Sequence, residues 1–340
     1  MSNESESDNV AQESFVSLRK VLIFVFAGVI LYLAILLFRE FDEILAALAA
    51  IEWWWVLPVM MGLSFLNYIL RYIKWQYFLH RINVNLSHAD SFSIFLAGFT
   101  LTTSPGKIGE AVKAYFINDM DDTPIAKTVP IVVSERVTDL LAMVLLAMIG
   151  LVLGLSGVDQ LTTVLLLGGI VLIGAIFLGQ PRFYNVFLRK MTSFGPLKRF
   201  QDSVDLIQDT MKKTLSPQPM TLSTAISIPG WFMECLELWL LLSLMTGAGI
   251  PNLTSTSITL LMIATFIHTT ASVIGALSFL PGGLGTYEVS STALIILLLS
   301  TSYAIAGAAT IIIRFVTLWF SVVVGFIALG IVTRRRKRAR

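Results

Sequence analysis

The stretch SFSIFLAGFTLTTSPGKIGEAVKAYFI, residues 91–117, is apolar along most of its length but is interrupted in the middle by Pro105, Gly106 and Gly109. Each apolar limb is shorter than the roughly 20 residues that a helix needs to cross a bilayer. We therefore predict a re-entrant hairpin, which enters the membrane and returns to the same face. Irregular backbone at membrane depth leaves peptide groups unpaired, so the break is expected to line a cavity or to face protein.

A second apolar stretch, residues 258–299, is interrupted in the same way. Each break is followed by an apolar limb and then by a helix with an arginine, Arg136 after 31 residues and Arg314 after 33. Three spanning helices are predicted between the breaks, so the second hairpin should enter from the opposite face. Inverted repeats with paired broken helices are how secondary transporters build a substrate site at the bilayer midplane. The second break holds Pro281, Gly282, Gly283 and Gly285.

The composition indicates a membrane protein. Of the 340 residues 56% are hydrophobic and 14% are charged, and the mean hydropathy is +0.80. A soluble domain of this length does not carry such a composition. We predict an all-α polytopic membrane bundle with six spanning helices and two re-entrant hairpins. The predicted spans are residues 21–38, 54–71, 126–155, 161–178, 225–245 and 304–332.

Basic residues are unevenly distributed between the loops. They gather in segments such as 71–81, 113–127 and 182–213, whereas residues 41–53 and 246–256 contain none. By the positive-inside rule the basic segments and both termini face the cytoplasm of a multi-pass protein in the cell membrane. We predict a disordered tail (1–18), one transmembrane domain (19–333) and a basic cytoplasmic tail (334–340). The transmembrane domain is expected to contain two inverted halves (50–155 and 222–332) and a cytoplasmic amphipathic segment (181–220).

Charged residues within the apolar stretches are the candidates for function, because each costs roughly 2.5–3.5 kcal/mol or more at a helix centre in a bilayer. We expect Lys107, Arg136 and Arg314 to bind an anion, together with the backbone at the prolines and glycines of the two breaks. Four acids are expected to position these bases or to couple transport to an ion, although those after the breaks could instead cap the restarting helices. They are Glu110, Glu135, Asp139 and Glu288.

Other features carry weaker signals. Glu234 and Glu237 form a third acidic pair that nothing elsewhere repeats, and His268 is expected to be a hydrogen-bonded interior residue. Three histidines and one cysteine offer no metal-ligand spacing, so neither a metal nor a cofactor is expected. The basic tail directly after a spanning helix is more typical of topology or anionic lipid contact than of nucleic-acid binding.

Five short stretches carry a family resemblance. They are RYIKW (71–75), GFTLTTSPGKIGE (98–110), ERVTDL (135–140), LPGGLGTYE (280–288) and RFVTLW (314–319). With these the chain resembles the lysylphosphatidylglycerol synthase transmembrane-region family, also described as the flippase-like domain. One position differs: relatives often carry an arginine where this chain has Lys107, which keeps the positive charge but not the bidentate geometry.

The resemblance implies translocation of an anionic lipid head group, on either a polyprenyl-phosphate-linked sugar or an aminoacyl phospholipid. Members that also synthesise lysyl lipid carry a soluble transferase domain after the membrane part, and this chain ends at Arg340, so no enzyme activity is expected. Two alternatives remain open. One is a membrane-embedded enzyme acting on polyprenyl-phosphate lipids, and the other is a non-transporting scaffold that recruits a glycosyltransferase through residues 182–213. A homo-oligomer is also compatible with the sequence.

Overall fold

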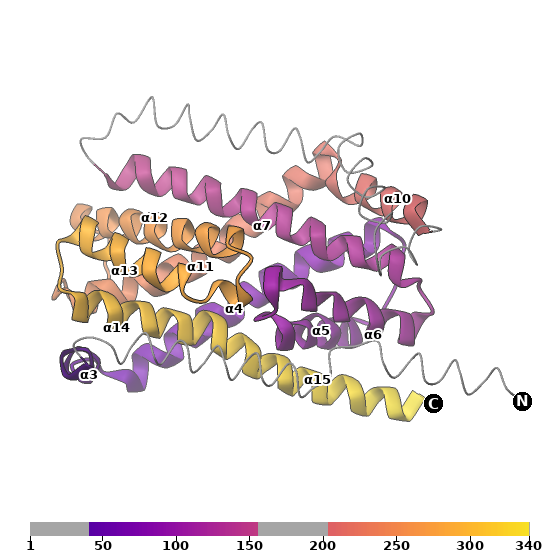
Figure 1. The fold of residues 1–340 in the computed structure, drawn as a ribbon, viewed down its shortest axis with the longest axis horizontal. Helices are drawn as coiled ribbons and strands as arrows, with labels where there is room; N and C mark the ends of the chain where they lie inside the picture. Colours follow the sequence, from indigo (N-terminus) through magenta and orange to yellow (C-terminus); the bar gives the residue numbers. More distant parts are fainter. Residues whose placement is uncertain (1–40, 156–202, 340) are drawn as a thin grey trace, which may run out of the picture.

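The computed structural model describes residues 41–155 and 203–339, and within these ranges the secondary structure is entirely helical (Figure 1). In chain order the elements are α3 Phe41–Ala49, α4 Trp53–Arg81, α5 His88–Ala97, the 3-10 turns η1 Gly98–Leu101 and η2 Pro105–Ala111, α6 Val112–Asp121, α7 Ile125–Gly154, α10 Val204–Leu215, α11 Pro217–Met245, α12 Ser255–Leu277, the 3-10 turn η4 Pro281–Gly283, α13 Thr286–Leu299, α14 Tyr303–Arg314, the π-helical segment η5 Phe315–Trp319 and α15 Phe320–Ala339.

The expected membrane bundle is confirmed, since six of the described helices are long and apolar enough to cross a bilayer. Four of them contain the predicted spans 54–71, 126–155, 225–245 and 304–332 with changes at the ends; α4, for example, continues to Arg81. The other two helices are the limbs of the second hairpin. The predicted spans 21–38 and 161–178, the tail 1–18 and most of segment 181–220 lie outside the described residues.

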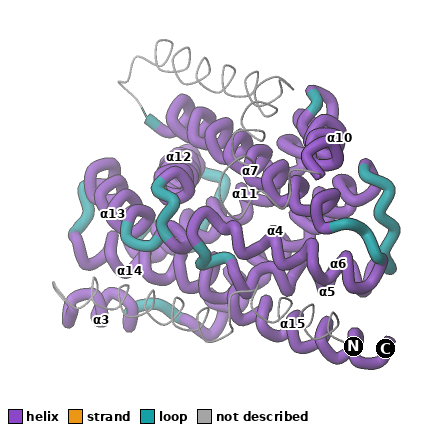
Figure 2. The backbone as a smooth tube through the Cα atoms, turned by 45° about the vertical axis from the view of Figure 1, so that its right-hand side comes forward, coloured by secondary structure: helices purple, strands orange, loops and turns teal. Residues whose placement is uncertain are grey.

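Both predicted breaks interrupt the helices. Figure 1 shows the two hairpins approaching each other from opposite ends of the molecule, and their tips, η2 and η4, are in contact. Figure 2 shows loop segments gathered there, with helices on either side. The membrane path of each hairpin stays a prediction, because α12 has 23 residues, a length of about 34 Å, and could cross the hydrocarbon by itself.

Each hairpin lies between two long helices in the chain, and the division into two inverted halves stays a prediction. The first hairpin lies between α4 and α7, and the second between α11 and the continuous helix formed by α14, η5 and α15. α10, the described part of the predicted amphipathic segment, packs on α7, where Thr214 Oγ1 lies 2.7 Å from Ser134 Oγ. A surface position for the remainder of that segment stays a prediction.

Close backbone packing places α12 against α7. A Cβ atom added at Gly150 would lie 2.6 Å from the Met262 carbonyl oxygen, and one at Gly154 would lie 2.9 Å from the Ile263 nitrogen. Two small residues four apart on one helix face allow backbones to approach this closely, which is a common packing mode in membranes. This contact positions the first limb of the second hairpin.

Candidate functional site

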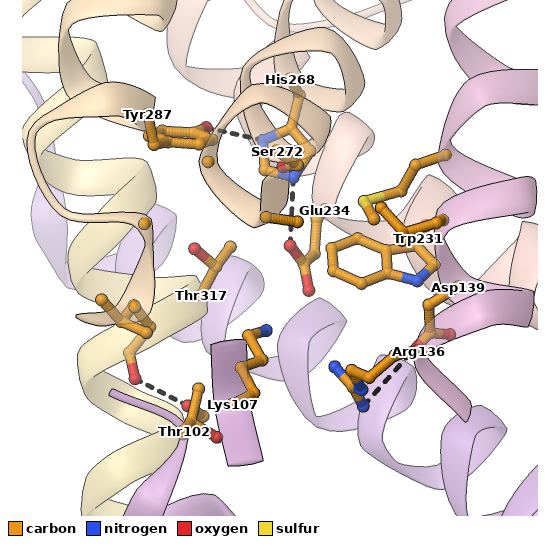
Figure 3. A pocket seen from close by; sticks show the side chains of 18 of the residues that line it. Thr102, Lys107, Arg136, Asp139, Trp231, Glu234, His268, Ser272, Tyr287 and Thr317 are labelled. Carbon is orange, nitrogen blue, oxygen red and sulfur yellow. Dashed lines mark hydrogen bonds and ion pairs between the residues drawn. The ribbon is translucent and has the colours of Figure 1, made fainter. Parts of the chain in front are cut away.

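The two hairpin tips meet at a cavity of about 210 Å³ in the middle of the bundle (Figure 3). Its wall combines apolar residues of α7, α11 and the second hairpin with an unusual concentration of ionisable groups. The charged residues of the wall are Arg71, Lys107, Arg136, Asp139, Glu234 and Arg314. The structure thus brings together the three bases predicted to bind an anion, from the first tip, α7 and α14.

Matching ion pairs secure the two hairpins. Glu110 Oε2 lies 3.3 Å from an Arg136 Nη2, and Glu288 Oε1 lies 2.7 Å from Arg314 Nε. In each pair the two residues are 26 positions apart in the chain. The sequence repeat therefore has a structural basis: the glutamate that follows each break binds the arginine of the next long helix. Neither glutamate is part of the cavity wall.

The second tip is stabilised by hydrogen bonds between its backbone and charged side chains. Arg314 Nη2 donates to the Gly282 carbonyl oxygen at 2.7 Å, and the Gly285 N–H donates to Glu288 Oε2 at 2.6 Å. Gly282, Gly283 and Gly285 have φ angles of 62°, 67° and 85°, which side chains disfavour. Gly282 and Gly283 line the cavity, whereas Gly285 precedes α13 away from the wall.

The first tip presents a lysine in an unfavourable backbone conformation. Pro105 and Gly106 begin η2, and Lys107 follows with a φ of 56°, in the left-handed region. This conformation costs an L-residue roughly 1–2 kcal/mol. Gly109 is required by close packing, because an added Cβ would lie 2.6 Å from Leu101 Cβ. The Lys107 side chain reaches the cavity, where its Nζ lies 6.0 Å from the centre of the Trp231 ring.

The acids of α7 each bind a base. Asp139 Oδ1 is 2.5 Å from Lys74 Nζ, and its Oδ2 is 3.3 Å from Arg136 Nη2. Glu135 Oε2 is 2.6 Å from Lys113 Nζ and lies behind the cavity wall. Arg136 and Asp139, three residues apart, therefore meet on one face of α7. These acids hold bases in place in the structure, and a role in ion coupling stays a prediction.

Three bases of the basic segments 71–81 and 113–127 are buried inside the bundle. Arg71, Lys74 and Lys113 have exposed fractions of 7%, 0% and 1%. The physical reason is that the carboxylates of α7 need counter-ions inside the bundle, and Lys74 and Lys113 supply them. The stretch RYIKW could have indicated this burial, because Arg71 and Lys74 are three residues apart and lie on the same helix face.

Two of the four bases in the cavity wall have no carboxylate partner. Arg136 and Arg314 are paired, but within the described residues Arg71 and Lys107 take part in no ion pair. The Arg71 Nε and Nη2 atoms are buried without any hydrogen-bond acceptor, and its guanidinium lies 5.1 Å from the centre of the Phe99 ring. Buried donors of this kind are costly unless something accepts from them, so the cavity is suited to an anion.

A chain of hydrogen bonds crosses the opposite side of the cavity. His268 Nε2 lies 3.1 Å from Glu234 Oε2, and the Tyr287 hydroxyl lies 2.9 Å from His268 Nδ1 (Figure 3). Glu234 Oε1 also accepts from Asn67. His268 is an interior hydrogen-bonded residue, as predicted, and Glu234 proves to be a wall residue. Across the described ranges, no three His, Cys, Asp or Glu side chains gather closely enough to hold a metal ion.

Comparison with known proteins agrees with this architecture. The family model described as the lysylphosphatidylglycerol synthase TM region matches residues 20–325. A UPF0104 membrane protein from Methanothermobacter thermautotrophicus is 24% identical over 342 aligned residues, which cover 91% of this chain and 95% of that protein. The matched region includes both hairpins and every charged residue of the cavity wall.

Proposed function

Because this multi-pass membrane protein belongs to the lysylphosphatidylglycerol synthase transmembrane-region family, we propose that it is a flippase-like transporter of an anionic lipid head group. One observation carries the proposal: Arg71 and Lys107 face a cavity at the contact of two broken hairpins, and neither has a carboxylate partner within the described residues. A phosphate is the ligand that such a site favours, since it accepts several charge-assisted hydrogen bonds at once.

The bases have different tasks in this proposal. Arg71 lines the cavity and carries a planar guanidinium suited to a bidentate contact with phosphate, whereas Lys107 acts as a point charge. Arg136 binds Glu110, and Arg314 binds Glu288. These two arginines therefore mainly position the hairpin tips, and they also add positive potential to the cavity. Alternating access would come from the two halves rocking about the tips, as in other transporters with inverted repeats.

The substrate class follows from the family and from the wall of the cavity. An anionic head group carried on a lipid, either a polyprenyl-phosphate-linked sugar or an aminoacyl phospholipid, fits a wall that is basic where the tips meet and apolar elsewhere. The proposal places the protein in the cell membrane with both termini in the cytoplasm, as a transporter without catalytic activity. A glycosyltransferase that makes or uses the lipid, or a second copy of the chain, would be its partner.

Transport can be tested with the purified chain in proteoliposomes that contain trace NBD-labelled phosphatidylglycerol or NBD-labelled polyprenyl phosphate. Dithionite added outside bleaches the outer leaflet, so the loss of the protected inner fraction reports flipping. The double variant Arg71→Gln, Lys107→Gln should slow flipping by at least tenfold, because hydrogen bonds to charged groups contribute about 1.5–3 kcal/mol each. Lys212→Gln, at an exposed position of α10, is the matched control. Equal rates for the double variant and the wild type would reject the proposal.

A further inference from the structure

Glu237 is a buried acid that the proposed anion site does not use. It lies on α11, its exposed fraction is 0%, and its Oε2 atom has no hydrogen-bond partner among the residues that the structure describes. No Lys, Arg or His lies within ion-pair distance of it in the described ranges; its nearest named partner is Ser64. An ionised carboxylate without a counter-ion is too costly in such an environment, and the usual response is to bind a proton.

The hydrogen bonds around Ser64 point to the same protonation state. Ser64 Oγ lies 2.9 Å from Glu237 Oε1 and 3.2 Å from the Val316 carbonyl oxygen. A hydroxyl group carries one hydrogen, so it cannot donate fully to both oxygens. Both bonds form if Glu237 is protonated and donates to Ser64, which in turn donates to Val316. Val316 belongs to the π-helical segment η5, a type of helix distortion that is frequent at functional sites.

The charges inside the bundle balance only if Glu237 is ionised. Among the described residues, six bases and six acids lie in the buried network and the cavity wall, so a neutral Glu237 leaves five negative charges against six positive ones. The protonated state therefore carries one excess positive charge, which a singly charged anion in the cavity would neutralise. The bases are Arg71, Lys74, Lys107, Lys113, Arg136 and Arg314, and the acids are Glu110, Glu135, Asp139, Glu234, Glu237 and Glu288.

Glu237 lies one helical turn from an acid of the cavity wall. Glu234 is three residues earlier on α11 and shares its helix face, and Glu234 lines the cavity. From Glu234 the hydrogen bonds continue through His268 to Tyr287, on the two limbs of the second hairpin. Glu237 therefore lies one helical turn from a chain of hydrogen-bonded side chains that reaches the second hairpin.

We propose that Glu237 is a proton-binding site, and that one proton bound there crosses the membrane with each anionic head group. The inference rests on the proposed transport function and identifies the proton gradient as the force that drives it. The proton comes from water on one side and is released to water on the other, with Glu234 and His268 as carriers, so the anion and the proton cross as a neutral pair. The helices packed against α11 and the second hairpin carry further titratable groups inside the bundle, among them Tyr68, Arg71, Lys74, Glu135, Arg136, Asp139, His268, Tyr287, Glu288 and Arg314.

The experiment uses the same proteoliposomes and NBD-labelled lipids, with the membrane potential clamped to zero and a pH gradient of one unit across the bilayer. One-to-one coupling should concentrate the labelled lipid about tenfold in the leaflet that faces the higher pH, since tenfold in concentration balances tenfold in proton activity. Glu237→Gln cannot bind the proton and should reduce this ratio to about one. Glu43→Gln, an exposed acid on α3, is the control and should keep the wild-type ratio.

A second measurement does not depend on the variant. Labelled lipid added to the outer leaflet of wild-type proteoliposomes without a pH gradient should lower the pH of a weakly buffered lumen, as read by trapped pyranine. About one proton should be taken up into the lumen with each lipid that is flipped inward. Flipping by the wild type with a leaflet ratio of one and no proton uptake would overturn this inference while leaving the transport function intact. Absence of flipping in the wild type would instead reject the transport function itself.

Discussion

The ion pair between Arg314 and Glu288 offers a sharp test of how the second hairpin tip is held. Its atoms are 2.7 Å apart, and so are those of the pair between Arg335 and Asp90 at the end of α15. The two pairs differ in exposure: the side chains are 9% and 6% exposed in the first pair, and 44% and 34% in the second. Burial, rather than distance, should therefore decide what each pair contributes.

Arg314→Gln leaves Glu288 buried without its counter-ion and also removes the hydrogen bond to the Gly282 carbonyl oxygen. Breaking a buried pair in this way costs about 3–5 kcal/mol of the free energy of unfolding. Arg335→Gln removes a solvent-exposed pair, and such pairs contribute about 0–1 kcal/mol. The double variant Arg314→Gln, Glu288→Gln should recover a large part of the loss, because no uncompensated charge remains.

The assay is unfolding of the purified protein in mixed micelles titrated with a denaturing detergent, followed by circular dichroism. A double-mutant cycle at each pair gives the coupling free energy, with the exposed pair as the internal reference. The reasoning is refuted if Arg314→Gln destabilises the protein no more than Arg335→Gln does, since the tip would then be held by packing alone.

Three further predictions concern helix packing, backbone strain and pH. Gly150→Leu should destabilise the protein by about 1–3 kcal/mol or more, measured by the same titration, because the new side chain would collide with the backbone of α12. Lys107→Gly should be about 1 kcal/mol more stable than Lys107→Ala, because only glycine adopts its positive φ without strain, while both variants lose anion transport in the flipping assay. Hydrogen bonds from the Ser87 hydroxyl and then from Arg335 lower the pKa of Asp90. The ion pair that attaches α15 to α5 should therefore persist above about pH 4 and weaken as the pH falls through that lowered pKa. Amide hydrogen exchange at Arg335 can measure this weakening.

Each of these predictions has a contrast within the protein. Gly62→Leu should be tolerated, because nothing lies within 4 Å of a Cβ added there, and an equal loss at both glycines would contradict the packing argument. Equal stability of the two variants at Lys107 would contradict the strain argument. If neither acid nor salt changes the hydrogen exchange at Arg335, the ion pair between Arg335 and Asp90 contributes nothing to the attachment of α15.

The sequence by itself determined the class of protein and the plan of the repeat. An apolar chain in lipid must pair its backbone within each segment, so long apolar runs become helices, and Pro-Gly clusters become the places where those helices stop. The helices that end at Ala97 and Leu277 before the two breaks follow from this. The similar spacing from each break to Arg136 and Arg314 also reflects a real correspondence, since both arginines bind the glutamate 26 positions before them.

Only the tertiary structure decided which charges are paired and which are free. Arg314 has no acid close to it in the sequence, yet the fold gives it Glu288. Arg71, from the basic segment 71–81, is buried in the cavity wall, and two of its donors meet no acceptor among the described residues. The reason is that an ion pair forms between groups that meet in space, and helices 26 or more residues apart meet through packing that local sequence does not encode. The protonation of Glu237 belongs to the same category, because it depends on Ser64 of another helix.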